Sequence, residues 1–94
     1  MRIKDLLKKR KFLNQPGYPD GEQNIYKFKN GYGASVVRNS ISYGHEEGLW
    51  ELGVITFDKN NDFKLCYDTE ITNDVIGYLT ENQVDEILEK IEKL

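Results

Sequence analysis

NGYGASVVRNSISYGHEEGLWELG, residues 30–53, carries the strongest structural signal in the chain. It sets most of the eight glycines between alternating Tyr, Val, Ile, Leu and Trp residues, a pattern typical of strands joined by tight turns. Asn30-Gly31 suits a two-residue type I′ hairpin turn, because both residues tolerate positive φ. These residues specify a hairpin-rich sheet and no chemical reaction.

The flanking sequence extends this block into a predicted four-stranded antiparallel β-meander. Polar turns at residues 43–48 and 58–62 separate the later strands. After the last strand, Thr72 is placed to cap a single helical turn that Gly77 ends. The four predicted strands lie at residues 25–29, 32–43, 49–57 and 63–67.

The sequence after the sheet predicts a C-terminal α-helix packed on one face of it. Thr80 and Gln83 form a capping box, while Leu79 and Val84 occupy the positions of a hydrophobic staple. The predicted fold class is therefore α+β. The apolar face of the helix continues through Ile87, Leu88, Ile91 and Leu94.

The N-terminal residues have their apolar side chains at helical spacing and predict a short amphipathic helix at residues 3–13. Residues 14–23 are dense in Pro, Gly, Asn and Asp, which fix or permit turn dihedrals, and predict a linker. The predicted organisation is a basic N-terminal helix and Pro/Gly linker at residues 1–23, then a single α+β domain at residues 24–94.

The predicted strand at residues 49–57 is apolar on both sides, which is not the pattern of a half-solvated strand. One C-terminal helix can cover only one face of the sheet. The second face therefore needs the N-terminal helix, a twin subunit or a partner protein. A homodimer formed through this second face is one expectation.

The composition favours a soluble globular domain, with 38% apolar and 31% charged residues. The net charge is −3, but residues 1–13 carry six basic and one acidic side chain, so a basic end precedes an acidic body. No run has the length of a membrane span or of a secretory signal, so we expect the cytoplasm and no membrane partner. Cys66 is the only cysteine, so no disulfide within the chain or thiolate metal cluster is expected.

Calcium, nucleotide and nucleophile motifs are incomplete in this chain. Residues 58–62 begin like a calcium loop, but Phe63 stands where glycine is needed and Thr69 where a bidentate glutamate is needed. Residues 31–33, Gly-Tyr-Gly, begin a dinucleotide fingerprint but continue into a predicted strand. No P-loop and no Gly-x-Ser-x-Gly elbow occurs. We therefore expect no cofactor, no metal and no catalytic residue.

Two basic groups are candidates for binding nucleic acid. Four consecutive cations near the N-terminus can neutralise phosphates, and two lysines alternate with Tyr26 and Phe28 on a strand of the kind that stacks single-stranded bases. The acidic remainder of the chain would repel a duplex, which makes nucleic acid the less favoured partner. The candidate residues are Lys8, Lys9, Arg10, Lys11, Lys27 and Lys29.

Arg38 lies inside a long predicted strand, and its charge predicts an ion pair with an acid such as Glu51. His45 lies beside two glutamates on a predicted hairpin tip, where a solvated turn, a metal and a partner contact are all compatible with the residues. Aromatic residues and arginine are enriched in protein interfaces. The candidate binding residues are Tyr32, Arg38, Tyr43, His45 and Trp50.

Several blocks taken together resemble a family of small uncharacterised proteins of tailed bacteriophages and prophages. They are NGYGASVVR at residues 30–38, SYG at 42–44, GLWEL at 48–52, YDT at 67–69, IT at 71–72 and DVIGYL at 74–79. The similarity covers residues 25–94, with His45 and Glu70 standing where we expect a small residue and a proline. The resemblance implies a phage origin and supplies no activity, cofactor or catalytic residue.

The leading hypothesis is a non-enzymatic phage or prophage accessory protein that binds a host or phage protein in the host cell cytoplasm. Host machinery and host defence are the targets that such an origin implies. The alternative is a nucleic-acid-associated protein that uses the basic N-terminal arm. A further alternative is a small nucleotide-processing or hydrolytic enzyme, which predicts a pocket holding a metal or a carboxylate with a raised pKa.

Overall fold

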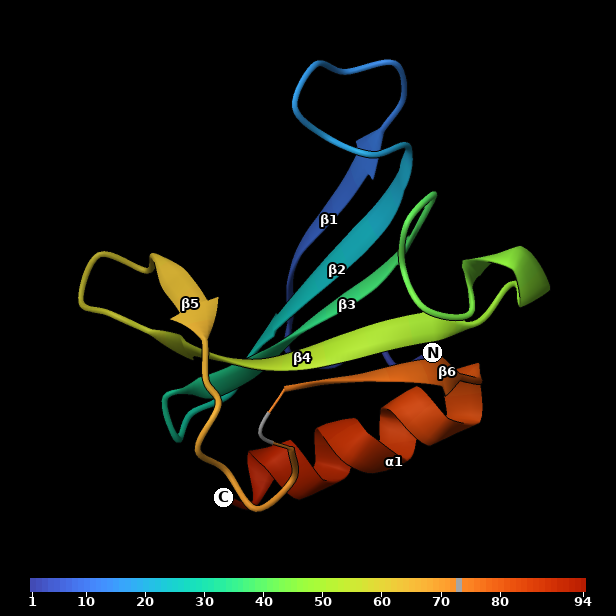
Figure 1. Cartoon of the computed structure of the whole chain (residues 1–94). Coiled ribbons are helices and arrows are strands. Elements are labelled where there is room, and N and C mark those ends of the chain that lie inside the picture. The colour runs from blue at the N-terminus through green and yellow to red at the C-terminus, as the bar shows by residue number, and fades with distance from the viewer. Residues whose placement is uncertain (73) are drawn as a thin grey trace.

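The computed structural model describes residues 1–72 and 74–94, and these form an antiparallel sheet of six strands with one α-helix against one face (Figure 1). A short 3-10 helix at His45–Glu47 lies between the third and fourth strands. The elements in chain order are β1 (Leu6–Phe12), β2 (Gly21–Lys27), β3 (Tyr32–Asn39), β4 (Trp50–Phe57), β5 (Phe63–Leu65), β6 (Val75–Leu79) and α1 (Glu81–Glu92).

Strand β4 has a neighbour on both sides along its length. One side pairs with β3, and the other side pairs with β6 at the start of β4 and with β5 at its end. Trp50 thus lies opposite Leu79, while Phe57 lies opposite Phe63. Strands β5 and β6 share one edge of β4, and β1 forms the other end of the sheet.

The hydrophobic core lies between the sheet and α1. Alternate residues of the strands face the helix, and Val36 of β3 and Leu52 of β4 are opposite each other and fully buried there. Burying a side chain of this size contributes about 1.5 to 3 kcal/mol. The helix supplies Val84, Leu88 and Ile91 to the same core.

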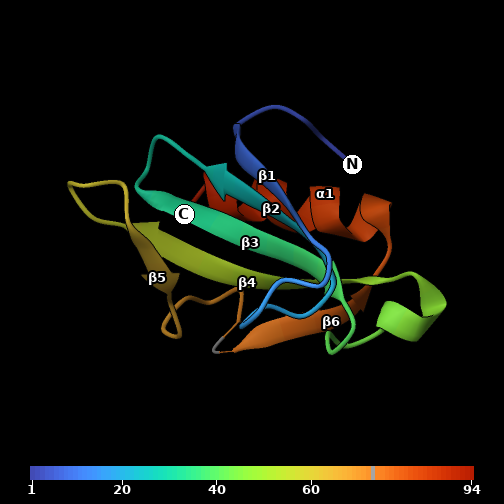
Figure 2. The ribbon, with the colours of Figure 1, turned by 90° about the horizontal axis from the view of Figure 1, so that it is seen from above.

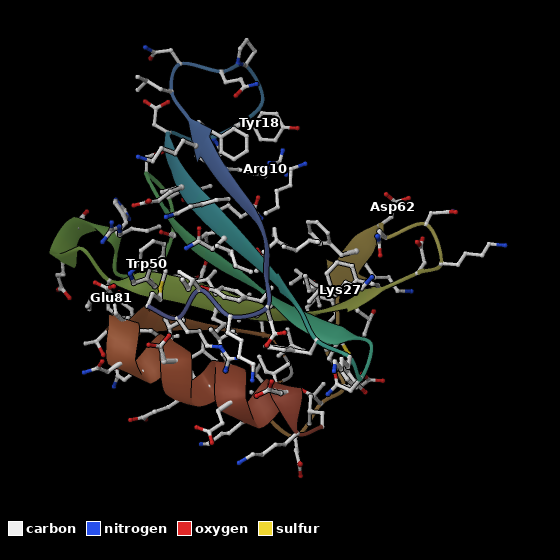
Figure 3. The ribbon with its side chains drawn as sticks, turned by 180° about the vertical axis from the view of Figure 1, so that it is seen from behind. Arg10, Tyr18, Lys27, Trp50, Asp62 and Glu81 are labelled. Atoms are coloured by element: carbon white, nitrogen blue, oxygen red, sulfur yellow. The ribbon has the colours of Figure 1, made fainter. Side chains whose placement is uncertain are left out.

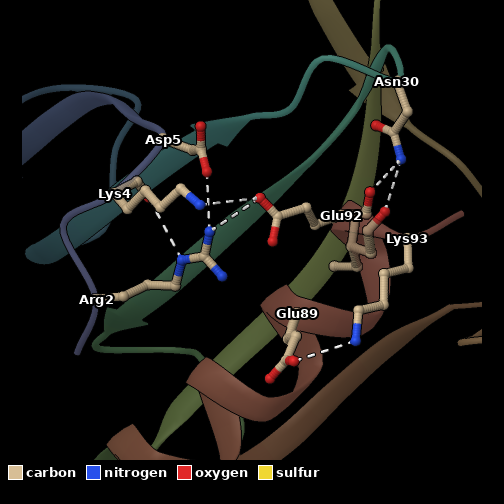
Figure 4. Close-up of polar contacts among 8 residues, drawn as sticks. Arg2, Lys4, Asp5, Asn30, Glu89, Glu92 and Lys93 are labelled. Atoms are coloured by element: carbon tan, nitrogen blue, oxygen red, sulfur yellow. Dashed lines mark hydrogen bonds and ion pairs between the residues drawn. The ribbon is translucent and has the colours of Figure 1, made fainter.

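Both ends of α1 are fixed by side chains. The predicted capping box is confirmed, because Thr80 Oγ1 accepts from the Gln83 backbone nitrogen at 3.2 Å and Gln83 Oε1 accepts from the Thr80 backbone nitrogen at 2.9 Å. At the other end, the Asn30 side-chain amide donates to the carbonyl oxygens of Ile91 at 2.9 Å and Glu92 at 3.2 Å (Figure 4). The first hairpin turn therefore also caps the helix.

The predicted N-terminal helix is wrong, because residues 6–12 form β1, which pairs antiparallel with β2. The lysine-rich sequence has helix-forming propensity, but hydrogen bonds along the free edge of β2 outweigh it. Residues 13–20 close the β1–β2 hairpin, and the expected boundary after residue 23 falls inside β2. The predicted count of four strands is accordingly too low.

The first residues anchor this strand to α1 and do not form a detached arm. The Arg2 guanidinium lies 2.9 Å from the Asp5 carboxylate and 3.6 Å from that of Glu92, and Lys4 lies 3.7 Å from Glu92 (Figure 4). The Arg2 backbone nitrogen also donates to Asp85 at 2.8 Å. The N-terminus therefore connects β1 to the helix.

Two further elements differ from prediction. The single helical turn expected at residues 72–77 is wrong, because strand β6 begins at Val75 and includes Gly77; Asn73 lies outside the described residues. The strand expected at residues 32–43 ends at Asn39, where the Asn39 side chain accepts from the Ile41 backbone nitrogen at 3.1 Å and starts a turn. No helix within residues 1–72 and 74–94 is both long and apolar enough to cross a membrane.

Candidate binding face

The face of the sheet opposite α1 is not covered by a helix of the described residues; we call it the open face (Figure 2). Side chains alternate along each strand, so the open-face residues are the neighbours of those in the core. Ile25 and Ile55 form its buried floor, each 1% exposed. The residues that surround this floor are Arg10, Phe12, Gln23, Lys27, Ser35, Val37, Phe57 and Phe63.

One aromatic cluster lies on the β1–β2 hairpin. The rings of Phe12 and Tyr18 stack with centroids 4.6 Å apart, and the Arg10 guanidinium carbon lies 4.8 Å from the centroid of Phe12 and 5.8 Å from that of Tyr18. Such a cation over an aromatic face is attracted to the ring quadrupole. Arg10 also donates to Gln23 Oε1 at 3.4 Å, and Gln23 donates to Ser35 Oγ at 2.9 Å. A polar network thus orients the first cluster.

A second aromatic cluster lies where β2 approaches the β4–β5 hairpin. The Lys27 ammonium lies 5.2 Å from the Phe57 ring centroid and donates to Asn61 Oδ1 in the hairpin turn. Phe57 and Phe63 meet edge to face, with centroids 5.9 Å apart. Both clusters therefore combine one cation with two aromatic rings.

The two clusters meet across a hollow of about 330 Å³. Phe12 and Tyr18 line it from the first hairpin, Phe63 lines it from the second, and Arg10 and Val37 lie between them. β1 and β5 stand at opposite ends of the strand order, so a shared hollow means that the sheet curves around the open face. Figure 3 shows Arg10 and Tyr18 on the side that faces the β4–β5 hairpin.

Arg38 and Trp50 lie together on the α1 side of the sheet. The Arg38 guanidinium carbon is 4.3 Å from the Trp50 ring centroid, and Arg38 donates to Glu22 at 2.6 Å and to the Gly48 carbonyl at 3.0 Å. The predicted ion pair of Arg38 with an acid is confirmed, but the acid is Glu22 and not the suggested Glu51. Glu51 pairs across the strands with Val37, so it projects from the open face while Arg38 projects from the other.

The other candidate binding residues lie apart from the open face. Tyr43, 61% exposed, and His45 line a separate hollow together with Tyr78. His45 Nδ1 lies 2.6 Å from the Ser42 carbonyl oxygen and donates to it. Tyr32 lines a third hollow, and Trp50 is only 4% exposed.

The basic candidates divide between two surfaces. Lys8, Lys9 and Lys11 are exposed on β1, and Lys29 is exposed in the first hairpin turn. Arg10 and Lys27 are half-buried in the two aromatic clusters. The alternation of inward Tyr26 and Phe28 with outward Lys27 follows the predicted pattern.

Glu51 is the carboxylate whose environment bears on the enzyme hypothesis. Burial raises its pKa above the ordinary 4.5, opposed by a hydrogen bond from the Tyr43 backbone and assisted by the charge of Asp74. Glu51 lines none of the hollows described above. Among residues 1–72 and 74–94, no group of three or more His, Cys, Asp or Glu is placed to hold a metal ion.

Comparisons with known proteins return no match to a family model, a curated protein or a solved structure.

The open-face aromatics Phe12, Tyr18, Phe57 and Phe63 were not among the sequence candidates. Part of their signal was present in the strand alternation, since Phe57 lies in the predicted strand at residues 49–57, which is apolar on both sides. Phe12 and Tyr18 could not be recognised as residues of the same face, because residues 3–13 were assigned to a helix and residues 14–23 to a linker. Phe12 and Tyr18 reach the open face because β1 and β2 form a hairpin.

Proposed function

We propose that this chain is a non-enzymatic binding protein whose open face receives another protein. The observation that carries the proposal is the hollow at which the two cation–aromatic clusters meet. Aromatic residues and arginine dominate the energetically important positions of protein interfaces. A face that exposes them, with an apolar floor, has the composition of an interface core.

The sequence blocks shared with small proteins of tailed bacteriophages and prophages support a phage or prophage origin as part of the same proposal. On that basis the partner is a host or phage protein in the host cell cytoplasm, with host machinery and host defence as target classes. The resemblance supports the origin alone, and the aromatic and cationic residues of the open face support binding independently of it.

Affinity capture from infected host cells with paired variants tests the proposal. The variant Tyr18→Ser with Phe63→Ser removes one ring from each cluster on the open face. The control, Tyr67→Ser with Tyr78→Ser, removes two aromatic rings that are exposed but lie outside the open-face hollow. We expect proteins that bind the unchanged chain and the control to be lost with the open-face variant.

Circular dichroism on each variant confirms that it remains folded. Equal capture by the open-face variant and the control would contradict the proposal.

A second copy of the chain is another occupant of the open face and would give the predicted homodimer. Sedimentation equilibrium separates this case from a different partner. A dimer that dissociates in the Tyr18→Ser, Phe63→Ser variant and persists in the control identifies self-association. A monomer at all concentrations assigns the face to a different protein.

Single-stranded nucleic acid is the second candidate ligand, and the observation that favours it is that Arg10 and Lys27 accompany aromatic rings on one face. Bases stack on such rings while cations bind the phosphates. Deletion of residues 1–13 would remove β1 from the sheet, so Arg10→Gln with Lys27→Gln is the suitable variant. Affinity for an oligothymidylate should fall steeply with added salt, and the slope should decrease in the variant.

A further inference from the structure

The outer edge of β1 is the free end of the sheet. In the described part of the chain, β1 pairs with β2 alone, and the backbone of residues 7–12 makes no hydrogen bond to any other segment. An unpaired strand edge presents a row of N–H and C=O groups that can pair with another chain. β1 is long enough, at seven residues, to align a second strand.

The hydrogen-bond pattern shows which residues of β1 face this edge. The Lys27 nitrogen donates to the Asp5 carbonyl, and the Phe28 nitrogen donates to the Tyr32 carbonyl, so odd-numbered residues of β2 bond to β1 and even-numbered ones to β3. Lys9 lies opposite Asn24 and Lys11 lies opposite Glu22. The backbone N–H and C=O groups of Lys9 and Lys11 therefore point away from the sheet.

The basic side chains of β1 are not neutralised within the described part of the chain. Arg2, Lys4 and Arg38 each lie within 4.0 Å of a carboxylate, whereas residues 8–11 form no ion pair there. Lys8, Lys9 and Lys11 are exposed. Three exposed lysines and the half-buried Arg10 thus form a continuous basic run at one sheet edge.

These cations project from both faces of the sheet. Arg10 is on the open face, while Lys9 and Lys11 share the face of Asn24 and Glu22 on the α1 side. A ligand lying on one face would meet half of them, whereas a strand lying in the plane of the sheet would meet all. Pairing of β1 with a second β1 would set cations opposite cations, which is destabilising.

We propose that the free edge of β1 binds an extended acidic segment of the partner protein as an additional strand of the sheet. Backbone hydrogen bonds to Lys9 and Lys11 provide affinity, and carboxylates on alternate faces of the added strand pair with the basic run. Exposed Leu7 and Leu13 flank that run and suit apolar residues on either side of the acidic segment. The proposal rests on the proposed function and specifies the partner's chemistry.

The test uses a fluorescein-labelled peptide with an acidic run as long as the basic run, flanked by Val and Ile, and fluorescence anisotropy. Lys11→Gln removes the charge and keeps the outward N–H, whereas Lys11→Pro removes the charge and the N–H. Proline is tolerated on an edge strand where the N–H faces solvent, so the β1–β2 ladder is retained. We expect Lys11→Pro to weaken binding by about tenfold more than Lys11→Gln, the effect of a lost backbone hydrogen bond.

Equal losses in the two variants, or no binding of the peptide to the unchanged protein, would overturn the proposal. An oligothymidylate with the same charge as the acidic peptide tests the nucleic-acid alternative. It should bind Lys11→Pro and Lys11→Gln with equal affinity. Amide hydrogen exchange gives a second readout on the unsubstituted protein. Protection of the Lys9 and Lys11 amides on peptide binding supports strand addition, and unchanged exchange contradicts it.

The proposed function can stand when this inference fails. If the captured partner is lost with Tyr18→Ser and Phe63→Ser but retained with Lys11→Pro, the open face binds it and the β1 edge does not. If neither variant alters capture, both proposals are wrong.

Discussion

Phe12 and Tyr18 stack with ring planes only 6° from parallel, across the loop that joins β1 to β2. The contact connects the last residue of β1 to a loop residue that is 49% exposed. It therefore fixes the conformation of the hairpin that forms one wall of the open-face hollow.

Replacement of Tyr18 by alanine should destabilise the protein by about 1 kcal/mol, because a stacked aromatic pair contributes about 0.5 to 1.5 kcal/mol beyond its buried area. Urea unfolding followed by tryptophan fluorescence measures the change. Tyr67→Ala is the matched control, since Tyr67 is similarly exposed and no stacked ring accompanies it among the described residues. Equal effects of the two variants would show that the stack contributes nothing.

Arg38→Lys should be destabilising although it conserves the charge. The guanidinium stacks on Trp50 and donates to two different acceptors, Glu22 and the Gly48 carbonyl, and a lysine ammonium cannot do all three. We expect a loss of about 1 to 2 kcal/mol in the free energy of unfolding. If Arg38→Lys unfolds at the same urea concentration as the unchanged protein, the planar contacts have no energetic role.

Glu51→Gln should stabilise the protein at neutral pH. Burial raises the pKa of Glu51 in the fold, so between its ordinary pKa and the raised value the folded state holds more protons than the unfolded state. Stability therefore falls as the pH rises through that window, and the penalty is fully present above it. Urea unfolding across the acid range should show that fall in the unchanged protein and a smaller one in Glu51→Gln.

Glu86→Gln, on the exposed side of α1, provides the comparison for this pH series. It should leave the fall in stability through the same window unchanged. If Glu51→Gln shows the same pH dependence of stability as the unchanged protein, the fall in stability does not come from Glu51.

Thr80→Ala should cost about 1 kcal/mol, because it leaves the Gln83 backbone N–H without its capping oxygen. Thr80→Ser keeps the hydroxyl and should lose much less. Thermal unfolding followed by circular dichroism compares them. Identical midpoints for the alanine and serine variants would mean that the capping box does not stabilise α1.

Local sequence signals were sufficient for α1 and the first hairpin. The capping box needs only Thr80 and Gln83, and Asn30-Gly31 marks the place of the first turn. The predicted two-residue type I′ turn is wrong, because only Gly31 of the pair has positive φ and the Phe28 nitrogen donates to the Tyr32 carbonyl across a loop of residues 29–31. Each element is determined by contacts within a few residues, so composition and spacing identify it.

Strand β1 depended on contacts that are distant in sequence. Its residues favour a helix in isolation, and they become a strand because β2 offers an unpaired edge. The error carried over to the candidate site, since the stack of Phe12 on Tyr18 exists only when the two strands form a hairpin. The acid that pairs with Arg38 was misidentified for a related reason, because the inter-strand register determines which acid shares its face.

Asn30 serves two elements at once, turning the first hairpin and donating its side-chain amide to carbonyls at the end of α1. Asn-Gly is also the dipeptide in which asparagine most readily loses its amide nitrogen, because glycine leaves the next backbone nitrogen unhindered. Deamidation would replace this donor with a carboxylate at the negative end of the helix dipole. Chemical ageing of the protein should therefore loosen the helix from the sheet, and a single mass increment on Asn30 should accompany the loss of thermal stability.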